Sequence, residues 1–585
     1  VWMVWYGVLI QSGTGLGVET INMSFLRILE NFTNQALIED VLRFFIAQLL
    51  LLTFLALIIY WASIGFEEWL KLTGWKSALA GSICPLVFLH LVNSTLYPVS
   101  VTSFPVSGFW SSVVLLAVAS LSVGLVVLAC MRRKVVALQV IFFLIVASVP
   151  YWGQGSTKES GAQKELNKNT PNVIVLGVDA LRPLELGYFG SEREVMPFLD
   201  KLLDHAEVYT NDFTPVARTH AAWVSILSGR YPYHNGLRYN LMVDKYIDKE
   251  HLITHVLKQH GYQSVWGLDE RRFNDIDKTY GFDRAVGPKI GAADFLITKF
   301  SDIPLINIFA NTQVGKELFP FVYINRGNFV TYVPYQFNSE LVSSLSRKKP
   351  VFLAAHLCLP HYPFVNNMMK RIEVNDGSDS ENYGNYLSML ELADRQLKDL
   401  LGKLKADGYL NNAIVYVLSD HGEGFPKIDK ALKSGNPYSS FKVDVAGHGT
   451  SLLTINQYHN LLAKLKFRDG VPVGKSGARD KLTSLIDVAP DIAKALSISQ
   501  GYDFDGMPLD SNPKERKVFL ESSYSNSAVS ESRINQLRVL QQSADAYFVN
   551  ASGRLRLQEK LYAGFNQAKQ RAVISSSGMM VALYP

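Results

Sequence analysis

The distribution of apolar residues divides the chain into two unlike parts. Up to about residue 151 the sequence consists of long apolar runs, and beyond it shorter apolar runs alternate with polar segments. Four of the long runs approach the ~20 apolar residues that are needed to cross the hydrocarbon core of a bilayer. These runs cover residues 41–64, 78–98, 110–131 and 135–151, and residues 1–10 could form the end of a fifth. We therefore predict a polytopic α-helical membrane domain over residues 1–151.

The basic residues between these runs predict an orientation. Residues 132–134 are all basic and the loop at 65–77 carries two lysines, whereas the loop at 99–109 has no Lys or Arg. Basic loops are retained on the cytoplasmic side of a membrane. One further crossing then places the remainder of the chain outside the cytoplasm. Residues 152–171 are rich in Gly, Ser, Lys and Gln, which is typical of a linker.

Strand-like and helix-like patterns alternate over residues 172–585. The predicted strands cover 172–179, 263–268, 350–357, 413–419 and 578–584, and the predicted helices cover 196–206, 219–227, 251–260, 382–404 and 485–496. This alternation indicates an α/β domain in which helices cover both faces of a central, mostly parallel sheet. Ligands of such sheets bind outside the carboxyl ends of the strands.

Charge and cysteine content narrow the possible functions. The net charge is only +5 over 585 residues and no long Lys/Arg block occurs, so a nucleic-acid partner is not expected. Of three cysteines, only Cys358 lies in the polar part of the chain. A disulfide framework or a zinc ribbon is therefore excluded there, and Cys358 is interpreted as a small buried hydrophobic residue.

Potential metal ligands follow two of the predicted strands. Asp179 ends the first, and Asp420-His421 directly follow the strand at 413–419. Carboxylate and imidazole groups suit zinc or manganese. Thr219 lies between them in sequence, and metal coordination would turn its weakly nucleophilic hydroxyl into an alkoxide. Each residue alone also has a structural explanation, because Asp is common in turns and Thr is a common helix cap.

Several motifs, in this order, resemble those of the alkaline phosphatase superfamily in its sulfatase and phosphoethanolamine-transferase branch. The matching stretches are 178–183, 186–190, 196–200, 219–236, 418–424, 486–491 and 505–509. The resemblance covers nearly all of residues 172–585 and implies a covalent phospho- or sulfo-enzyme intermediate. It also implies Asp179, Thr219, Asp420 and His421 as metal ligands, with Thr219 as the nucleophile. Zinc is the expected ion, with manganese and calcium as alternatives.

The resemblance suggests further residues around the substrate. His356 and His361 are similar to the family's substrate-contacting histidines, and His448 lies where relatives have a histidine near the metal. These histidines could also hold a second metal. Arg182 and Arg218 would either clamp an anionic group of the substrate or pair with carboxylates of the protein.

Two departures from the sulfatase pattern favour a different subclass. Thr219 stands where formylglycine sulfatases oxidise Cys or Ser to an aldehyde, and oxidation of Thr would give a ketone. Ala180 stands where many sulfatases have a second aspartate. A Thr nucleophile instead resembles lipoteichoic acid synthases, phosphoethanolamine transferases and nucleotide pyrophosphatases/phosphodiesterases. The first two groups are also polytopic membrane proteins with an extracytoplasmic catalytic domain.

The expected function is therefore a membrane-bound, metal-dependent phosphotransferase. A phosphoethanolamine- or phosphoglycerol-type headgroup would pass from a membrane phospholipid donor, through Thr219, to a glycolipid, glycan or lipid A acceptor. The expected location is a bacterial inner (plasma) membrane with the catalytic domain in the periplasm. A sulfatase- or phosphodiesterase-type hydrolase is the alternative enzyme. A pseudoenzyme that senses lipid or binds a partner is the alternative without catalysis.

Overall fold

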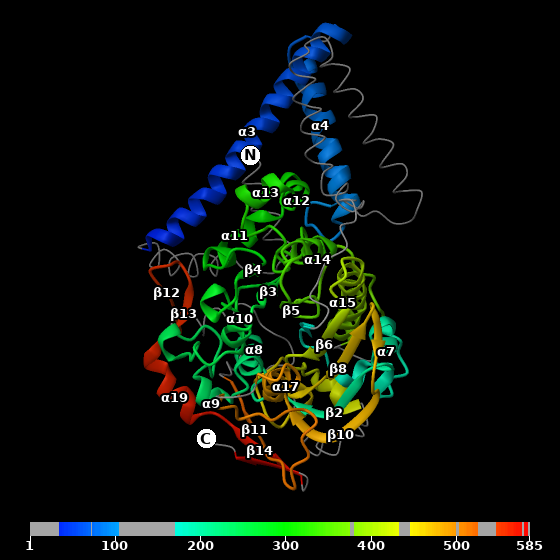
Figure 1. Cartoon of the computed structure of the whole chain (residues 1–585). Coiled ribbons are helices and arrows are strands. Elements are labelled where there is room, and N and C mark those ends of the chain that lie inside the picture. Colours follow the sequence, from blue (N-terminus) through cyan, green and yellow to red (C-terminus); the bar gives the residue numbers. More distant parts are fainter. Residues whose placement is uncertain are drawn as a thin grey trace.

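Among the residues that the computed structural model describes, two long helices precede the α/β domain (Figure 1). They are α3 (Gln35–Leu70) and α4 (Trp75–Leu96), and both are long and apolar enough to cross a membrane. They contain almost all of the predicted spans 41–64 and 78–98. The structure describes residues 34–71, 73–103, 170–374, 380–431, 445–498, 502–523, 546–575 and 578–582. The other two predicted spans, the run at 1–10 and residues 152–169 of the predicted linker lie outside the described residues.

The outward face of α3 is apolar. Leu42, Ile46 and Leu49 are 54%, 56% and 63% exposed, although a helix on the surface of a soluble domain normally presents polar side chains there. Such a face is suited to lipid. The start of the helix is fixed by Asn34, whose side chain accepts a hydrogen bond from the amide of Leu37.

A ten-stranded sheet forms the centre of the domain, with the order β10-β2-β8-β6-β1-β5-β3-β4 and two short strands, β7 and β9, at its side. Along this path neighbouring strands are parallel except at β8, which runs antiparallel to both β2 and β6. The strands are β1 (Asn172–Val178), β2 (Glu207–Phe213), β3 (Gln263–Leu268), β4 (Arg284–Val286), β5 (Val351–Leu357), β6 (Asn412–Ser419), β7 (His459–Asn460), β8 (Leu462–Arg468), β9 (Val471–Val473) and β10 (Gly477–Ser484).

Separate hydrophobic cores cover the two faces of the sheet. Alternate residues of β1 enter different cores, because successive side chains of a strand point to opposite faces. One core includes α7 (Pro197–Leu203), α14 (Pro334–Ser343) and α15 (Ser380–Ala406). The other includes α8 (Thr219–Ser228), α10 (Ile253–Gln259) and α17 (Val488–Ala495). The prediction of a mostly parallel sheet covered on both faces is confirmed.

Smaller elements surround this centre. A three-stranded antiparallel sheet has the order β11-β14-β15, and β12 pairs with β13. The remaining helices and strands are α9 (Pro232–Asn235), α11 (Ala293–Ser301), α12 (Pro304–Phe309), α13 (Gln313–Leu318), α16 (Pro426–Ala431), β11 (Val518–Glu521), β12 (Tyr547–Val549), β13 (Leu555–Leu557), α19 (Tyr562–Gln567), β14 (Arg571–Ser575) and β15 (Gly578–Ala582). In Figure 1, α12 and α13 lie between the domain-side ends of α3 and α4.

The predicted strands correspond to β1, β3, β5, β6 and β15, and the predicted helices to α7, α8, α10, α15 and α17. The prediction missed β2, β8 and β10. Charged residues interrupt β8, and β10 has few apolar residues, so their strand conformation depends on pairing with neighbours. Asp394 of α15 joins this helix to α7. Both oxygens of Asp394 accept hydrogen bonds from backbone amides at the start of α7.

Candidate active site

The candidate site lies at the carboxyl ends of the three central strands. Asp179 follows β1, and Asp420 and His421 follow β6. His356 is the penultimate residue of β5. Because β5 and β6 both pair with β1 in parallel, their carboxyl ends reach the same edge of the sheet.

Asp179, Asp420 and His421 form a compact group of potential metal ligands. One ligand atom from each lies within 4.8 Å of the others, and all three residues are buried. Nε2 of His421 lies 3.3 Å from Oδ2 of Asp420 and 3.9 Å from Oδ1 of Asp179. Among the described residues, that Oδ1 of Asp179 has no hydrogen-bond partner. A buried carboxylate oxygen needs a partner, and a divalent cation held by this oxygen- and nitrogen-donor set would provide one.

Thr219 is the first residue of α8, and it lies beside this group. Its Oγ1 is 3.4 Å from Nε2 of His421, and the residue is 8% exposed. The backbone at Arg218 is extended, so the helix begins at Thr219. The first amides of a helix have no partner within it, and the helix dipole favours negative charge at this end. The hydroxyl is therefore placed where an anionic phosphoryl or sulfuryl group would be stabilised.

His356 lies between the two acidic ligands. Its Nε2 is 3.2 Å from Oδ2 of Asp179 and 3.3 Å from Oδ2 of Asp420. Burial opposes a charge on the ring, but Asp420 and Asp179 raise the pKa of His356 to about 10. Burial also opposes ionisation of Asp179, but His361 and His356 hold the pKa of this carboxyl well below its usual range. His356 was expected to contact the substrate or to hold a second metal, and its Nε2 lies against two of the potential metal ligands.

Two further histidines line the same site. The ring of His448 stacks on His421, with centroids 4.1 Å apart, and lies 5.5 Å from the ring of His361. Nδ1 of His448 is 3.0 Å from Oε2 of Glu423. Burial lowers the pKa of His448 and raises that of Glu423, to about 7. The sequence analysis did not assign a role to Glu423, although it lies two residues after His421 within a matching motif.

Arg182 has partners other than a substrate. Its Nε lies 3.0 Å from Oε1 of Glu185, and its Nη1 lies 2.9 Å from Oδ1 of Asp429. Burial opposes the charge of the guanidinium, but Asp429 and Glu185 hold the pKa of Arg182 above its usual range. Of the two roles considered for Arg182, the structure shows pairing with carboxylates. This fully buried side chain also donates from Nη1 to the backbone carbonyl of Glu423, so it supports the segment that follows His421.

The backbone after the first ligand is strained. Ala180 has φ of 54°, which is uncommon for a residue with a side chain. The conformation is held by two contacts, because the Tyr386 hydroxyl donates to the Ala180 carbonyl at 2.9 Å and the Ala180 amide donates to Oδ1 of Asp420 at 3.4 Å. The second contact joins the segment after β1 to the ligand after β6.

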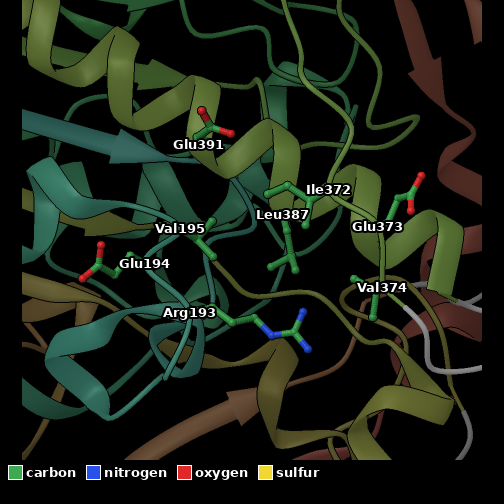
Figure 2. Close-up of a pocket in the computed structure, with 8 residues that line it drawn as sticks. All are labelled: Arg193, Glu194, Val195, Ile372, Glu373, Val374, Leu387 and Glu391. Atoms are coloured by element: carbon green, nitrogen blue, oxygen red, sulfur yellow. The ribbon is translucent and has the colours of Figure 1, made fainter.

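A separate pocket of about 550 Å³ shares no lining residue with this site. It is lined by Arg193, Glu194, Val195, Ile372, Glu373, Val374, Leu387 and Glu391. In Figure 2 the three carboxylates point in different directions and do not converge on one position. The residues with catalytic chemistry therefore lie at the strand ends and not in this pocket.

The central sheet, the ligand group at its carboxyl edge and the adjacent hydroxyl define a metal-dependent hydrolase or transferase of the alkaline phosphatase superfamily. The chain belongs to the sulfatase family, whose family model matches residues 171–497. The predicted membership of this superfamily is thereby confirmed.

Similarity to individual proteins is more distant. An ulvan-active sulfatase of Formosa agariphila is 25% identical over 278 residues, which are 43% of this chain and 50% of that protein. The chain thus spans about half the length of the curated relatives it matches. The structure of a phosphonate monoester hydrolase of Agrobacterium radiobacter shows 16% identity and a TM-score of 0.44, covering 71% of this chain and 89% of that one. The structure of the lipoteichoic acid synthase LtaP of Listeria monocytogenes shows 15% identity and a TM-score of 0.40, covering 60% of this chain and 78% of that one.

Proposed function

We propose that this protein is a membrane-bound, metal-dependent phosphotransferase. It moves a phosphoethanolamine- or phosphoglycerol-type headgroup from a membrane phospholipid to a glycolipid, glycan or lipid A acceptor. The observation that carries the proposal is the position of the Thr219 hydroxyl at the start of α8, 3.4 Å from Nε2 of His421. A hydroxyl in this position forms a phosphoester directly and needs no prior oxidation.

Asp179, Asp420, His421 and Thr219 would hold one divalent cation, for which zinc suits the mixed oxygen and nitrogen donors. When bound there, such a cation lowers the pKa of a coordinated hydroxyl and neutralises charge on a phosphoryl oxygen. The calcium site of many sulfatases uses a further aspartate, and Ala180 stands at that position. Zinc or manganese is therefore favoured over calcium.

The proposed reaction has two displacement steps at phosphorus. In the first, Oγ1 of Thr219 gives up its proton and forms a bond to phosphorus, the bond to the diacylglycerol oxygen breaks, and that oxygen takes up a proton. In the second, an acceptor hydroxyl loses its proton and attacks phosphorus, which releases Oγ1 of Thr219 to regain a proton. The contact of Nδ1 of His448 with Glu423 orients the ring, so that its Nε2 can exchange a proton with the leaving or entering oxygen.

The two candidate membrane helices support a lipid substrate. The domain-side ends of α3 and α4 both contact the α/β domain. The catalytic domain is thus held close to any bilayer that these helices cross, where phospholipid headgroups are concentrated. The proposed location is the inner membrane of a bacterium, with the α/β domain in the periplasm.

Hydrolysis of a sulfate ester or phosphodiester is the second candidate. The sulfatases among the curated relatives favour this alternative, whereas Thr219 disfavours the usual sulfatase chemistry because it cannot yield formylglycine. The two candidates differ in the fate of the group on Thr219, which passes to an organic hydroxyl in one case and to water in the other.

Product analysis with the full chain in lipid nanodiscs tests the proposal. The nanodiscs contain phosphatidylethanolamine or phosphatidylglycerol labelled in the headgroup, together with lipid A or a glycolipid as acceptor. Labelled acceptor supports transfer, and free headgroup phosphate alone establishes a phosphodiesterase. Release of sulfate from aryl sulfates without phospholipid turnover would establish a sulfatase. A pseudoenzyme predicts no turnover of any of these substrates.

A further inference from the structure

A helical insertion between β4 and β5 packs directly against the two candidate membrane helices. We call residues 292–322, which contain α11, α12 and α13, the helical insertion. Its buried apolar side chains form one hydrophobic core with those of α3 and α4, separate from the cores on the two faces of the sheet. The rings of Phe44 and Phe319 lie 5.7 Å apart, and those of Phe45 and Phe300 lie 5.5 Å apart.

Polar contacts fix the insertion to α4 and to the segment that follows it as well. Oδ1 of Asp302 accepts a hydrogen bond from the Ser100 hydroxyl at 2.6 Å, and Oδ2 accepts one from the amide of Val101 at 2.9 Å. The side-chain amide of Asn307 donates to Oδ1 of Asn93 at 2.8 Å, and both asparagines are buried. The insertion is therefore held by specific contacts in a defined position between the two helices (Figure 1).

The contacts with α3 indicate how deeply the insertion would lie in a bilayer that this helix crosses. Asp40 pairs with Lys289, and this ion pair marks a position outside the hydrocarbon region. Phe45, which contacts Phe300, lies five residues further along α3 and is therefore at most about 7.5 Å deeper than Asp40 at 1.5 Å per residue. A depth of about 5–10 Å is typical of elements that lie at the boundary between headgroups and acyl chains.

Three apolar side chains of this region are exposed. Phe300 is 44% exposed, Val314 is 45% exposed, and the neighbouring Phe273 is 37% exposed. Phe273 also contacts Phe295 of α11, with ring centroids 5.4 Å apart. Scattered exposed apolar residues are ordinary on a soluble surface, but Phe300 packs against Phe45 of α3, and the outward face of that helix carries the exposed Leu42 and Ile46.

We propose that the helical insertion is a second membrane contact, which enters the outer boundary of the same bilayer that α3 and α4 cross. Phe300 and Val314 would lie among the lipid headgroups and upper acyl chains. The partner of this surface is the phospholipid bilayer and not a second protein, because Phe300 packs against α3, whose outward face is suited to lipid. The inference depends on α3 crossing a membrane and is independent of which group Thr219 transfers.

The same contacts would hold the site at a fixed height above the bilayer. Asp294 of α11 accepts hydrogen bonds from the Asn325 side chain at 3.2 Å. The adjacent Arg326 donates to the backbone carbonyls of Leu359 and Tyr362, on either side of His361. This loop also reaches α4, because the Asn367 side chain donates to the carbonyl of Leu96.

Chain length then limits the distance of the site from the membrane. Asn367 follows His361 by six residues, which span at most about 22 Å when fully extended. The His361 loop is thus connected directly to α4 and, through Arg326 and α11, to α3. A phospholipid headgroup at the outer surface of the bilayer would lie within reach of this loop. The docked insertion would restrict tilting of the domain.

Photo-crosslinking in the full chain tests the proposed contact. The photoreactive phenylalanine analogue p-benzoylphenylalanine is placed at position 300, and at position 519 in a control protein. Phe519 is 50% exposed on β11, at the end of the domain away from α3 and α4. Both proteins are reconstituted in nanodiscs of phosphatidylethanolamine and phosphatidylglycerol, and adducts are identified by mass spectrometry after illumination.

We expect phospholipid adducts at position 300 at least tenfold above those at position 519. Equal yields at the two positions, or no lipid adduct at position 300, would overturn the proposal. A crosslink between two copies of the chain at position 300 would also overturn it, because a second copy would then occupy the surface. Unchanged unfolding temperatures of both labelled proteins show that the outcome reports on contact and not on misfolding.

Discussion

Nδ1 of His448 lies 3.0 Å from Oε2 of Glu423, and this contact joins a ring stacked on His421, a potential metal ligand, to a buried carboxyl group. A carboxylate in this position fixes the orientation of the imidazole ring, as partners of metal-site histidines commonly do. We expect Glu423→Gln to reduce turnover by about 10- to 100-fold, because an amide replaces the carboxyl partner of Nδ1. Steady-state kinetics check this, with the exposed Glu192→Gln as a control that retains full turnover. Wild-type kinetics of Glu423→Gln would rule out an orienting role.

The Thr219 hydroxyl is predicted to be the nucleophile. Thr219→Ala should lower turnover by roughly 10⁴-fold or more, since loss of a covalent nucleophile has effects of this order. Thr219→Ser should retain measurable activity because it keeps the hydroxyl. Intact-mass spectrometry after mixing with phospholipid should show a covalent adduct on the wild-type chain and none on Thr219→Ala. An adduct on Thr219→Ala would place the nucleophile elsewhere.

The full-length protein is predicted to bind at least one divalent ion per chain. Elemental analysis after purification without added metal should detect zinc or manganese, and strong chelators should abolish turnover. Asp179→Asn should lower the metal content, because Oδ1 of Asp179 has no protein partner among the described residues and is the oxygen that a cation would use. Full turnover of a preparation that contains no metal would contradict this assignment.

Gly177 permits the close approach of two side chains behind the ligands. A Cβ atom at this position would lie 2.6 Å from Cζ2 of Trp223 and 2.7 Å from Nδ1 of His356. Gly177→Ala should therefore displace both rings, destabilise the domain by about 1–3 kcal/mol and reduce turnover. Thermal unfolding and kinetics measure these effects.

The matched control for Gly177→Ala is Gly402→Ala on α15, where an added Cβ meets no atom within 4 Å. This change should leave turnover unchanged and should stabilise the domain by about 0.4–1 kcal/mol, because Ala favours a helix. Equal effects of the two substitutions would show that the close approach of Trp223 and His356 to Gly177 determines neither stability nor turnover.

Asp394 is predicted to make stability depend on pH. Burial raises its pKa from 3.8 to about 6, although the amides of Phe198 and Leu199 oppose the shift. The pKa of Asp394 is higher in the folded state than in the unfolded state, so protonation of this carboxyl stabilises the fold. That stabilisation is fully present below about pH 3.8 and is lost as pH rises through 6. The total change is at most about 3 kcal/mol.

Thermal unfolding of the wild type and of Asp394→Asn from pH 4 to pH 8 tests this expectation. Between pH 4 and pH 6 the wild type should lose stability relative to Asp394→Asn, and above pH 7 the difference should be constant. A constant difference over the whole range would show that Asp394 has an ordinary pKa in the folded protein.

Local patterns in the sequence were sufficient for the central strands and for the principal ligands. The strands β1, β5 and β6 are buried on both faces, so each is a continuous apolar run that is visible without a structure. Parallel strands bring their carboxyl ends to one edge of a sheet, and this rule placed Asp179 beside Asp420 and His421. Thr219 was recognised from its motif, and the structure places its hydroxyl next to that group.

Only the tertiary structure decided which side chains surround these ligands. His356 lies between two carboxylates because β5 is adjacent to β1, and strand order is not encoded by any local pattern. Arg182 pairs with Glu185 and Asp429, the second of which is 247 residues away along the chain. In the sequence, the apolar residues of the helical insertion cannot be distinguished from those of an ordinary domain core. Only the folded structure shows that they pack against α3 and α4. The sequence determined the chemistry and the buried strands because both are local, whereas partners distant in sequence depend on the packing of the folded chain.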